Sequence, residues 1–215
     1  MGYGTTTTES ISISQWVECC TATAQAIDAL VRWSTDWQLS ISIIKCCVLN
    51  IGRVTFSSCL NIDGIVLPTV KSARDLGVLV VHDLSPSLHI TSIVARAHKR
   101  TAAIYRAFLF HSRNIDLLLR AYLTYVRPLI EHDSVIWSPY TVKDIELIGS
   151  VQCRFTKRLP GLNILPYAER LKRLDLPSLE LRRLRADLIF CYKIVFSLTD
   201  LQVSEFFWDG NPLYN

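Results

Sequence analysis

Two adjacent thiols follow a lysine in "DWQLSISIIKCCVLNIG", residues 36–52. A thiolate can bind a metal or act as a nucleophile, so Cys46 and Cys47 are the first candidates for chemistry. The chain has five histidines, without H-x-x-x-H spacing, and its cysteines form no C-x-x-C pair, so no local zinc scaffold is indicated. The seven cysteines are Cys19, Cys20, Cys46, Cys47, Cys59, Cys153 and Cys191.

Adjacent residues of a strand point to opposite faces, so Cys46 and Cys47 could not hold one ion together. An odd number of cysteines also argues against the disulfide framework of a secreted protein. We therefore interpret the thiols as small hydrophobic groups, and no Cys–His–acid constellation indicates a hydrolase. Lys45 remains the residue of interest in this segment, with a solvent-facing strand lysine as the alternative.

Basic side chains are concentrated in the second half of the chain. Residues 94–193 carry 18 Lys or Arg and 9 Asp or Glu, whereas the other residues carry 5 and 10. Such a distribution favours a polyanionic partner, and an ordinary solvated helix surface is the alternative. At helical spacing the basic residues form three stripes. Residues 87–110 contribute Arg96, Lys99, Arg100 and Arg106. Residues 143–158 contribute Arg154, Lys157 and Arg158, and residues 178–197 contribute Arg182, Arg183 and Arg185.

The periodicity of apolar residues predicts the elements that must position these groups. Residues 1–20 contain an irregular N-terminal segment, 21–38 a helix and 39–51 a strand. Asp63-Gly64 between apolar residues indicates a hairpin, and "RDLGVLVVHDL" indicates a further strand. Helices follow at about 87–110, 114–131, 143–158, 166–174 and 178–197, with a capping box from Thr141 to Asp144.

These elements predict an α+β fold: a small antiparallel sheet with one packing helix in residues 21–85, followed by a mainly helical bundle in residues 86–215. The last long helix has an apolar stripe with the three arginines Arg182, Arg183 and Arg185 off it. Half of the residues are hydrophobic, which excludes a disordered chain. No stretch reaches the length of an uncharged membrane span, so we expect an intracellular protein, cytoplasmic or nuclear, without a membrane partner.

Six fragments, in this order, resemble the C-terminal part of reverse transcriptases from LINE-type (non-LTR) retrotransposons, the Jockey-like group in particular. They are "ALVRWSTDWQLSISIIKCCVLNIG", "ARDLGVLV", "HI" followed by a basic helix, "AYLTYVRPLIEHDSVIWSPY", "VQCRFTKRLPGL" and "LPYAERLKRLDLPSLELRRLRADLIFCYKI". The resemblance covers roughly residues 20–210. It implies that residues 21–85 are the end of the polymerase palm and that the helical remainder is the thumb and a following helical region.

The resemblance also implies roles for particular residues. "WQLSISIIKC" is similar to motif D, in which Lys45 would be the general acid that protonates the leaving pyrophosphate. "RDLGV" is similar to motif E, the primer grip: Leu76 and Gly77 match, and Asp75 stands where an aromatic residue is often seen. His132 and Asp133 also depart from the family, which usually has an aromatic and a small residue there.

The metal-binding aspartates of such polymerases are missing from this sequence. The Y-A-D-D-type turn expected before residue 21 is replaced by "MGYGTTTTESISISQW", which has no adjacent acidic pair. The fingers, the first catalytic aspartate and the endonuclease are absent too. We therefore expect this chain to be a fragment that is inactive alone, with Mg²⁺ required only by an intact family member.

Two functions from different classes remain. The first is a template–primer-binding module of a reverse transcriptase, an RNA-directed DNA polymerase, whose partners are RNA or an RNA–DNA hybrid and the missing fingers and palm. The second is a degraded remnant or interaction protein without nucleic-acid activity, whose exposed apolar patches mark lost contacts.

Overall fold

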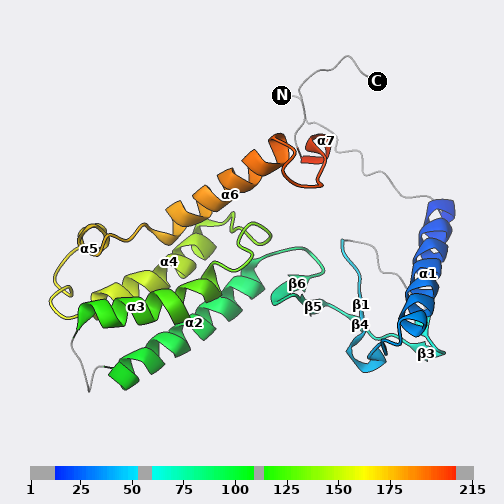
Figure 1. Cartoon of the computed structure of the whole chain (residues 1–215), viewed down its shortest axis with the longest axis horizontal. Helices are drawn as coiled ribbons and strands as arrows, with labels where there is room; N and C mark the ends of the chain where they lie inside the picture. The colour runs from blue at the N-terminus through cyan, green and yellow to red at the C-terminus, as the bar shows by residue number, and fades with distance from the viewer. Residues whose placement is uncertain (1–12, 53–59, 109–113, 207–215) are drawn as a thin grey trace, which may run out of the picture. The chain divides into compact units, whose positions relative to one another are not determined.

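The computed structural model describes the backbone of residues 13–52, 60–108 and 114–206 (Figure 1). The chain divides into two compact units, residues 1–73 with 81–84 and residues 74–80 with 85–215. Helices and three two-stranded sheets make up the described chain, which confirms an α+β fold with a helical bundle. The expected boundary was residue 85, and the division differs from it in assigning the segment 74–80 to the helical unit.

The first unit begins with a long helix, α1 (Ile13–Asp36). The expected irregular segment 1–20 is therefore wrong from Ile13 onward, and residues 1–12 lie outside the described residues. Ile13 to Cys20 contains neither proline nor glycine, so nothing in this run stops the helix from extending toward the N-terminus.

The strand expected at residues 39–51 is wrong over most of its length. Ile43–Lys45 forms a 3-10 turn, η1, and only β1 (Val48–Leu49) is a strand. β1 pairs in parallel with β4 (Thr69–Val70). A β-branched run becomes a strand only along the part that finds a partner, which explains why most of this run stays irregular.

The hairpin expected at Asp63-Gly64 is confirmed. β2 (Asn61–Ile62) pairs antiparallel with β3 (Ile65–Val66). Asp63 has φ 50° and Gly64 has φ 78°, as a two-residue turn of type I′ requires. The segment "RDLGVLVVHDL" forms two strands rather than one, β5 (Ser72–Asp75) and β6 (Val78–Val81), paired across the turn Leu76-Gly77.

The second unit is built from helices at the expected positions, with one further short helix, α7, that the sequence analysis did not predict. They are α2 (Ser87–Phe108), α3 (Ile115–Tyr125), the 3-10 helix η2 (Arg127–Ile130), α4 (Val142–Lys157), α5 (Tyr167–Arg173), α6 (Leu179–Val195) and α7 (Val203–Phe206). The expected cap is confirmed, because the Thr141 side chain accepts a hydrogen bond from the Asp144 amide at 3.2 Å.

An aromatic group lies at the centre of this unit. The rings of Tyr122 (α3) and Phe155 (α4) stack with centroids 4.3 Å apart, and Tyr105 (α2) lies 5.6 Å from Phe155. Burial raises the pKa of the Tyr105 hydroxyl, which donates to the Phe155 carbonyl at 2.5 Å. Helices α2, α3 and α4 thus meet at one buried cluster, and this cluster determines which of their faces remain exposed.

α6 buries a different face from the one that its apolar stripe predicts. Its buried residues are Leu179, Arg183 and Ile194, while the apolar stripe that sequence periodicity would place on a core is exposed. The exposed stripe consists of Leu181, Leu184, Leu188, Tyr192 and Val195. Across residues 13–52, 60–108 and 114–206, no helix is long and apolar enough to cross a membrane.

Candidate nucleic-acid interface

Basic residues cover the outer side of α2. The four cations expected there are all exposed: Arg96, Lys99, Arg100 and Arg106. The opposite side of the helix is buried through residues such as Ala97, Thr101 and Ile104. The core contacts of α2 therefore leave its charged side exposed to a polyanion, although one Arg100 nitrogen, Nη1, donates to the Tyr125 carbonyl at 3.1 Å.

The turn between β5 and β6 has a backbone that depends on glycine. Leu76 has φ 44° and Gly77 has φ 94°. The Arg74 guanidinium donates to the Gly77 carbonyl at 3.0 Å, and the Leu76 side chain is exposed. Asp75 is exposed as well. The three residues predicted to resemble a primer grip thus form the outward tip of a tight hairpin.

A pocket of about 230 Å³ joins this turn to the basic helix. It brings together Gly77 and two of the predicted cations, Arg96 and Arg100, which sequence analysis placed in separate motifs. Its lining residues are Gly77, His89, Ile93, Arg96, Arg100, Pro128, Leu129 and His132. Two guanidinium groups above an apolar floor suit an anion attached to a flat or apolar body, such as a nucleotide phosphate.

His132 closes one side of the pocket. Its Nε2 lies 3.3 Å from the Leu76 carbonyl oxygen and 2.9 Å from Asp133 Oδ2. Both neighbours are acceptors, so Nε2 carries the proton and donates. His132 therefore braces the hairpin turn, and Asp133 holds the His132 ring. Sequence reasoning did not assign them this role, because the contact joins positions far apart in the chain.

His89 is a site residue to which sequence reasoning gave no role. Its Nδ1 accepts a hydrogen bond from the Leu79 amide at 3.0 Å, and its ring lies 5.2 Å from the Trp137 ring. Burial lowers the pKa of His89, and the charges of Arg96, Arg74 and His132 lower it further. Two of these groups, Arg96 and His132, also line the pocket.

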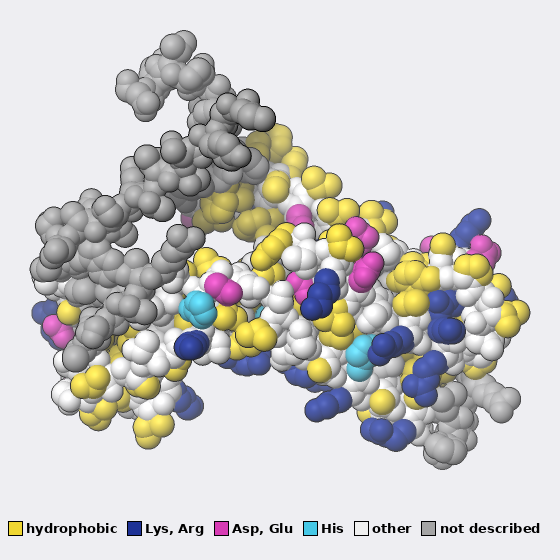
Figure 2. All heavy atoms as spheres, turned by 180° about the vertical axis from the view of Figure 1, so that it is seen from behind, with side chains coloured by type: hydrophobic (Ala, Val, Ile, Leu, Met, Phe, Trp, Pro, Cys, Tyr) yellow, Lys and Arg dark blue, Asp and Glu magenta, His cyan; other side chains and the backbone are white. Residues whose placement is uncertain are grey.

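The cations of α4 lie near aromatic and histidine side chains of α2. Arg154, Lys157 and Arg158 are exposed. The Arg158 guanidinium lies over the Tyr105 ring, 4.4 Å from its centroid. Burial lowers the pKa of His98, and the charge of Arg154 lowers it further. Figure 2 shows Lys and Arg side chains gathered on one face of the helical unit.

Two of the predicted cations on α6 are engaged within the bundle, which corrects the expected third stripe. Arg182 donates from both Nε and Nη2 to the carboxylate of Glu131, with Nη2–Oε2 at 3.0 Å. Arg183 is only 5% exposed, and burial lowers its pKa. Arg185 alone of the three is exposed. The partly buried carboxylate of Glu131, the residue after η2, holds Arg182 against the bundle, and helix periodicity cannot reveal such a partner.

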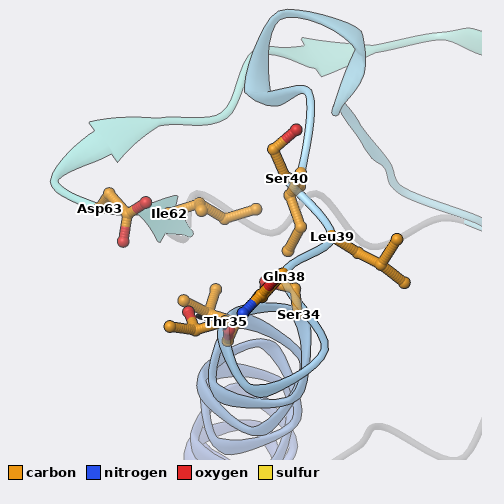
Figure 3. A pocket seen from close by; sticks show the side chains of 9 residues that line it. Ser34, Thr35, Gln38, Leu39, Ser40, Ile62 and Asp63 are labelled. Atoms are coloured by element: carbon orange, nitrogen blue, oxygen red, sulfur yellow. Dashed lines mark hydrogen bonds between the residues drawn. The ribbon is translucent and has the colours of Figure 1, made fainter.

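Lys45 lies in η1 of the first unit, with its side chain exposed. A pocket of about 420 Å³ is also found in this unit, between the end of α1 and the β2–β3 hairpin (Figure 3). Its lining includes Ser34, Thr35, Gln38 and Asp63 but not Lys45. A single carboxylate among hydroxyl, amide and apolar groups offers no arrangement for phosphoryl transfer.

Among the described residues, no group of three or more His, Cys, Asp or Glu side chains could hold a metal ion. The described cysteines, Cys46, Cys47, Cys153 and Cys191, are free thiols. Cys153 contacts the Arg170 guanidinium, with Sγ 3.4 Å from Nη2.

No protein-family model, curated protein or solved structure matches this chain.

Proposed function

We propose that the helical unit binds a template–primer duplex of RNA and DNA, as the thumb-like part of a LINE-type retrotransposon reverse transcriptase, and that this chain alone does not extend a primer. The observation that carries the proposal is the pocket in which Gly77 of the primer-grip-like turn lies beside Arg96 and Arg100. Two motifs that a polymerase would use on the same primer strand are thereby adjacent.

The surface around the pocket suits a nucleic-acid backbone. Lys99 and Arg106 extend the charge along α2, and Arg154, Lys157 and Arg158 extend it onto α4. A positively charged surface binds the phosphate backbone with an affinity that does not depend on base sequence, because binding releases the counterions that surround the duplex. Arg182 and Arg183 are left out of the proposed surface, since the charge of Arg182 is paired with the Glu131 carboxylate and Arg183 is buried.

A salt titration tests the binding. We expect the purified chain to bind a labelled RNA–DNA hybrid with an affinity that falls steeply as salt rises, measured by fluorescence anisotropy. The double variant Arg96→Ala/Arg100→Ala should reduce the slope of log affinity against log salt by about 1 to 2, because each lost phosphate contact removes about one released counterion.

The matched control is Lys143→Ala/Lys172→Ala, which removes the same number of exposed charges outside the proposed surface. Its slope should stay close to that of the parent chain. Equal losses in the two double variants would mean that binding follows net charge alone, and the specific surface would be abandoned.

A primer-extension assay tests the second half of the proposal. The sequence contains no adjacent pair of aspartates, and transfer of a nucleotidyl group depends on two metal ions held by carboxylates. We expect no incorporation of deoxynucleotides by the purified chain with Mg²⁺ on a primed RNA template. Incorporation above that of a heat-inactivated sample would refute this expectation.

The alternative, a remnant or interaction protein without nucleic-acid activity, has its own support. The end of α1 and the residue after it expose three large apolar side chains: Leu30, Trp33 (49% exposed) and Trp37 (67% exposed). Such a face is typical of a helix that has a partner elsewhere. Absence of hybrid binding at low salt would favour this second function.

A further inference from the structure

The outward face of α6 carries a heptad pattern. Leu181, Leu184, Leu188, Cys191 and Val195 follow one another at spacings of three and four residues, as the a and d positions of a coiled coil do. Leu184 is 54% exposed, Leu188 is 69% exposed and Val195 is 50% exposed. The helix thus presents a seam of leucines to solvent where a surface helix normally presents charge.

The inward face of α6 is held by polar contacts, so its orientation is determined. Arg182 pairs with Glu131, and Asp187 accepts a hydrogen bond from the Ser138 hydroxyl at 3.2 Å. Arg183 is buried on the same side. Turning the helix to bury the leucines would break these contacts and expose Leu179 and Ile194, which are now buried. The apolar seam therefore belongs outside the monomer.

The charges that flank the seam indicate what covers it. Glu180 stands at a g position and Arg185 at the following e position. In a parallel pair of helices the g residue of one chain faces the e residue of the other, five positions further on. Glu180 of each copy would then lie opposite Arg185 of the other, so the twofold symmetry would give two equivalent ion pairs. An antiparallel pair centred on the seam would instead set Glu180 near the C-terminal end of the second α6, away from its Arg185.

We propose that α6 is a dimerisation helix whose outer face binds α6 of a second copy of this chain in parallel, with Leu184 and Leu188 at the centre of the contact. The interface is isologous, since the same surface is used by both copies. The contact lies outside the cation surface on α2 and α4, so it does not depend on nucleic-acid binding.

Sedimentation equilibrium of the full chain without nucleic acid tests the association. We expect a dimer that Leu188→Asp weakens by at least about tenfold, because each copy would bring an unpaired carboxylate into the seam. Leu188 faces solvent in the monomer, so the circular dichroism spectrum of the Leu188→Asp variant should match that of the parent protein. Ile136→Asp, at an exposed apolar position outside α6, is the matched control and should leave the dimer intact.

The direction of the helices is tested separately. In the parallel register Cys191 faces Cys191 of the second copy, so mild oxidation should give a disulfide-linked dimer that Cys191→Ser abolishes and Cys153→Ser does not. Glu180→Arg and Arg185→Glu should each weaken association, and the double variant should restore it.

A chain that stays monomeric, or a dimer that Leu188→Asp leaves unchanged, would overturn the proposal. A dimer sensitive to Leu188→Asp but never cross-linked through Cys191 would overturn the parallel register. None of these results bears on the hybrid-binding assay, so the proposed function would stand or fall independently.

Discussion

At the scale of single residues, the neighbours of His89 determine its tautomer and lower its pKa. Its Nδ1 accepts from the Leu79 amide, so this nitrogen is unprotonated and the proton of the neutral ring sits on Nε2. Burial, Arg96, Arg74 and His132 all lower its pKa from 6.5. A charged His89 would lose the Leu79 hydrogen bond and repel its neighbours, so the folded state favours the neutral form.

This environment predicts a loss of stability in mild acid. The folded pKa of His89 lies below 6.5, the value for the unfolded chain, so the unfolded state binds the proton first. The contribution of His89 should be fully present above about pH 7 and should decline as pH falls below 6.5. The free energy of unfolding, measured in urea from pH 7.5 to pH 5, checks this.

The comparison with His89→Gln isolates the effect, because the glutamine side chain can still accept the Leu79 hydrogen bond but does not titrate. The difference in unfolding free energy between the two proteins should become smaller as pH falls. The pKa of His98 is lowered as well, but its contribution is the same in both proteins and cancels in the difference. A difference independent of pH would show that His89 is protonated equally in both states.

At the scale of elements, one carboxylate ties two helices together. Asp144 in the first turn of α4 is buried and accepts from the Ser87 hydroxyl at 2.7 Å and from the Thr141 hydroxyl at 2.8 Å. Ser87 is the first residue of α2. The same side chain therefore supports the beginning of α4 and fixes α2 beside it, which holds the cation surface in place.

We expect Asp144→Ala to lower the free energy of unfolding by about 2 kcal/mol, because it leaves two partly buried hydroxyl groups without their acceptor. Asp116→Ala is the matched control: Asp116 is also an acidic first-turn residue, but it is exposed, and its loss should cost at most about 0.5 kcal/mol. Equal costs in urea titrations would mean that only the charge at the helix end matters.

The helices could be predicted from sequence because their causes are local. Apolar periodicity, the Thr141 cap and the prolines between helices are all visible within a few residues. The irregular stretch before β1 and the inward turn of Arg182 depend on partners distant in sequence. Glu131 is such a partner, and nothing near Arg182 signals it.

The sequence predicts which residues of the candidate site are exposed, but not that they lie next to one another. Exposure of Arg96 and Arg100 follows from the buried side of α2. Their position beside Gly77 follows from His132 and His89, which fix the hairpin turn against the helical bundle. Long-range hydrogen bonds of this kind leave no periodic trace in the sequence.

At the scale of the whole molecule, the buried apolar residues are unevenly shared. The core cluster runs from Val78 to Leu179 and lies entirely in the helical unit. In the first unit the buried described residues are Ser34, Ile62, Leu67 and Val81. Apolar burial is the main favourable term in folding, so the two units should differ in local stability.

Hydrogen exchange should reveal this difference. Amides in residues 93–105 and 148–156 lie on helices with many buried side chains, whereas among residues 21–36 of α1 only Ser34 is buried. Relative to unfolded peptides, we expect the α2 and α4 segments to exchange at least about tenfold more slowly than α1, because α1 can open without exposing a core. Mass spectrometry of peptic fragments measures both in one sample. Equal protection of residues 21–36 would show that the face with Trp33 and Trp37 is covered in solution, and α1 would then belong to a stable interface.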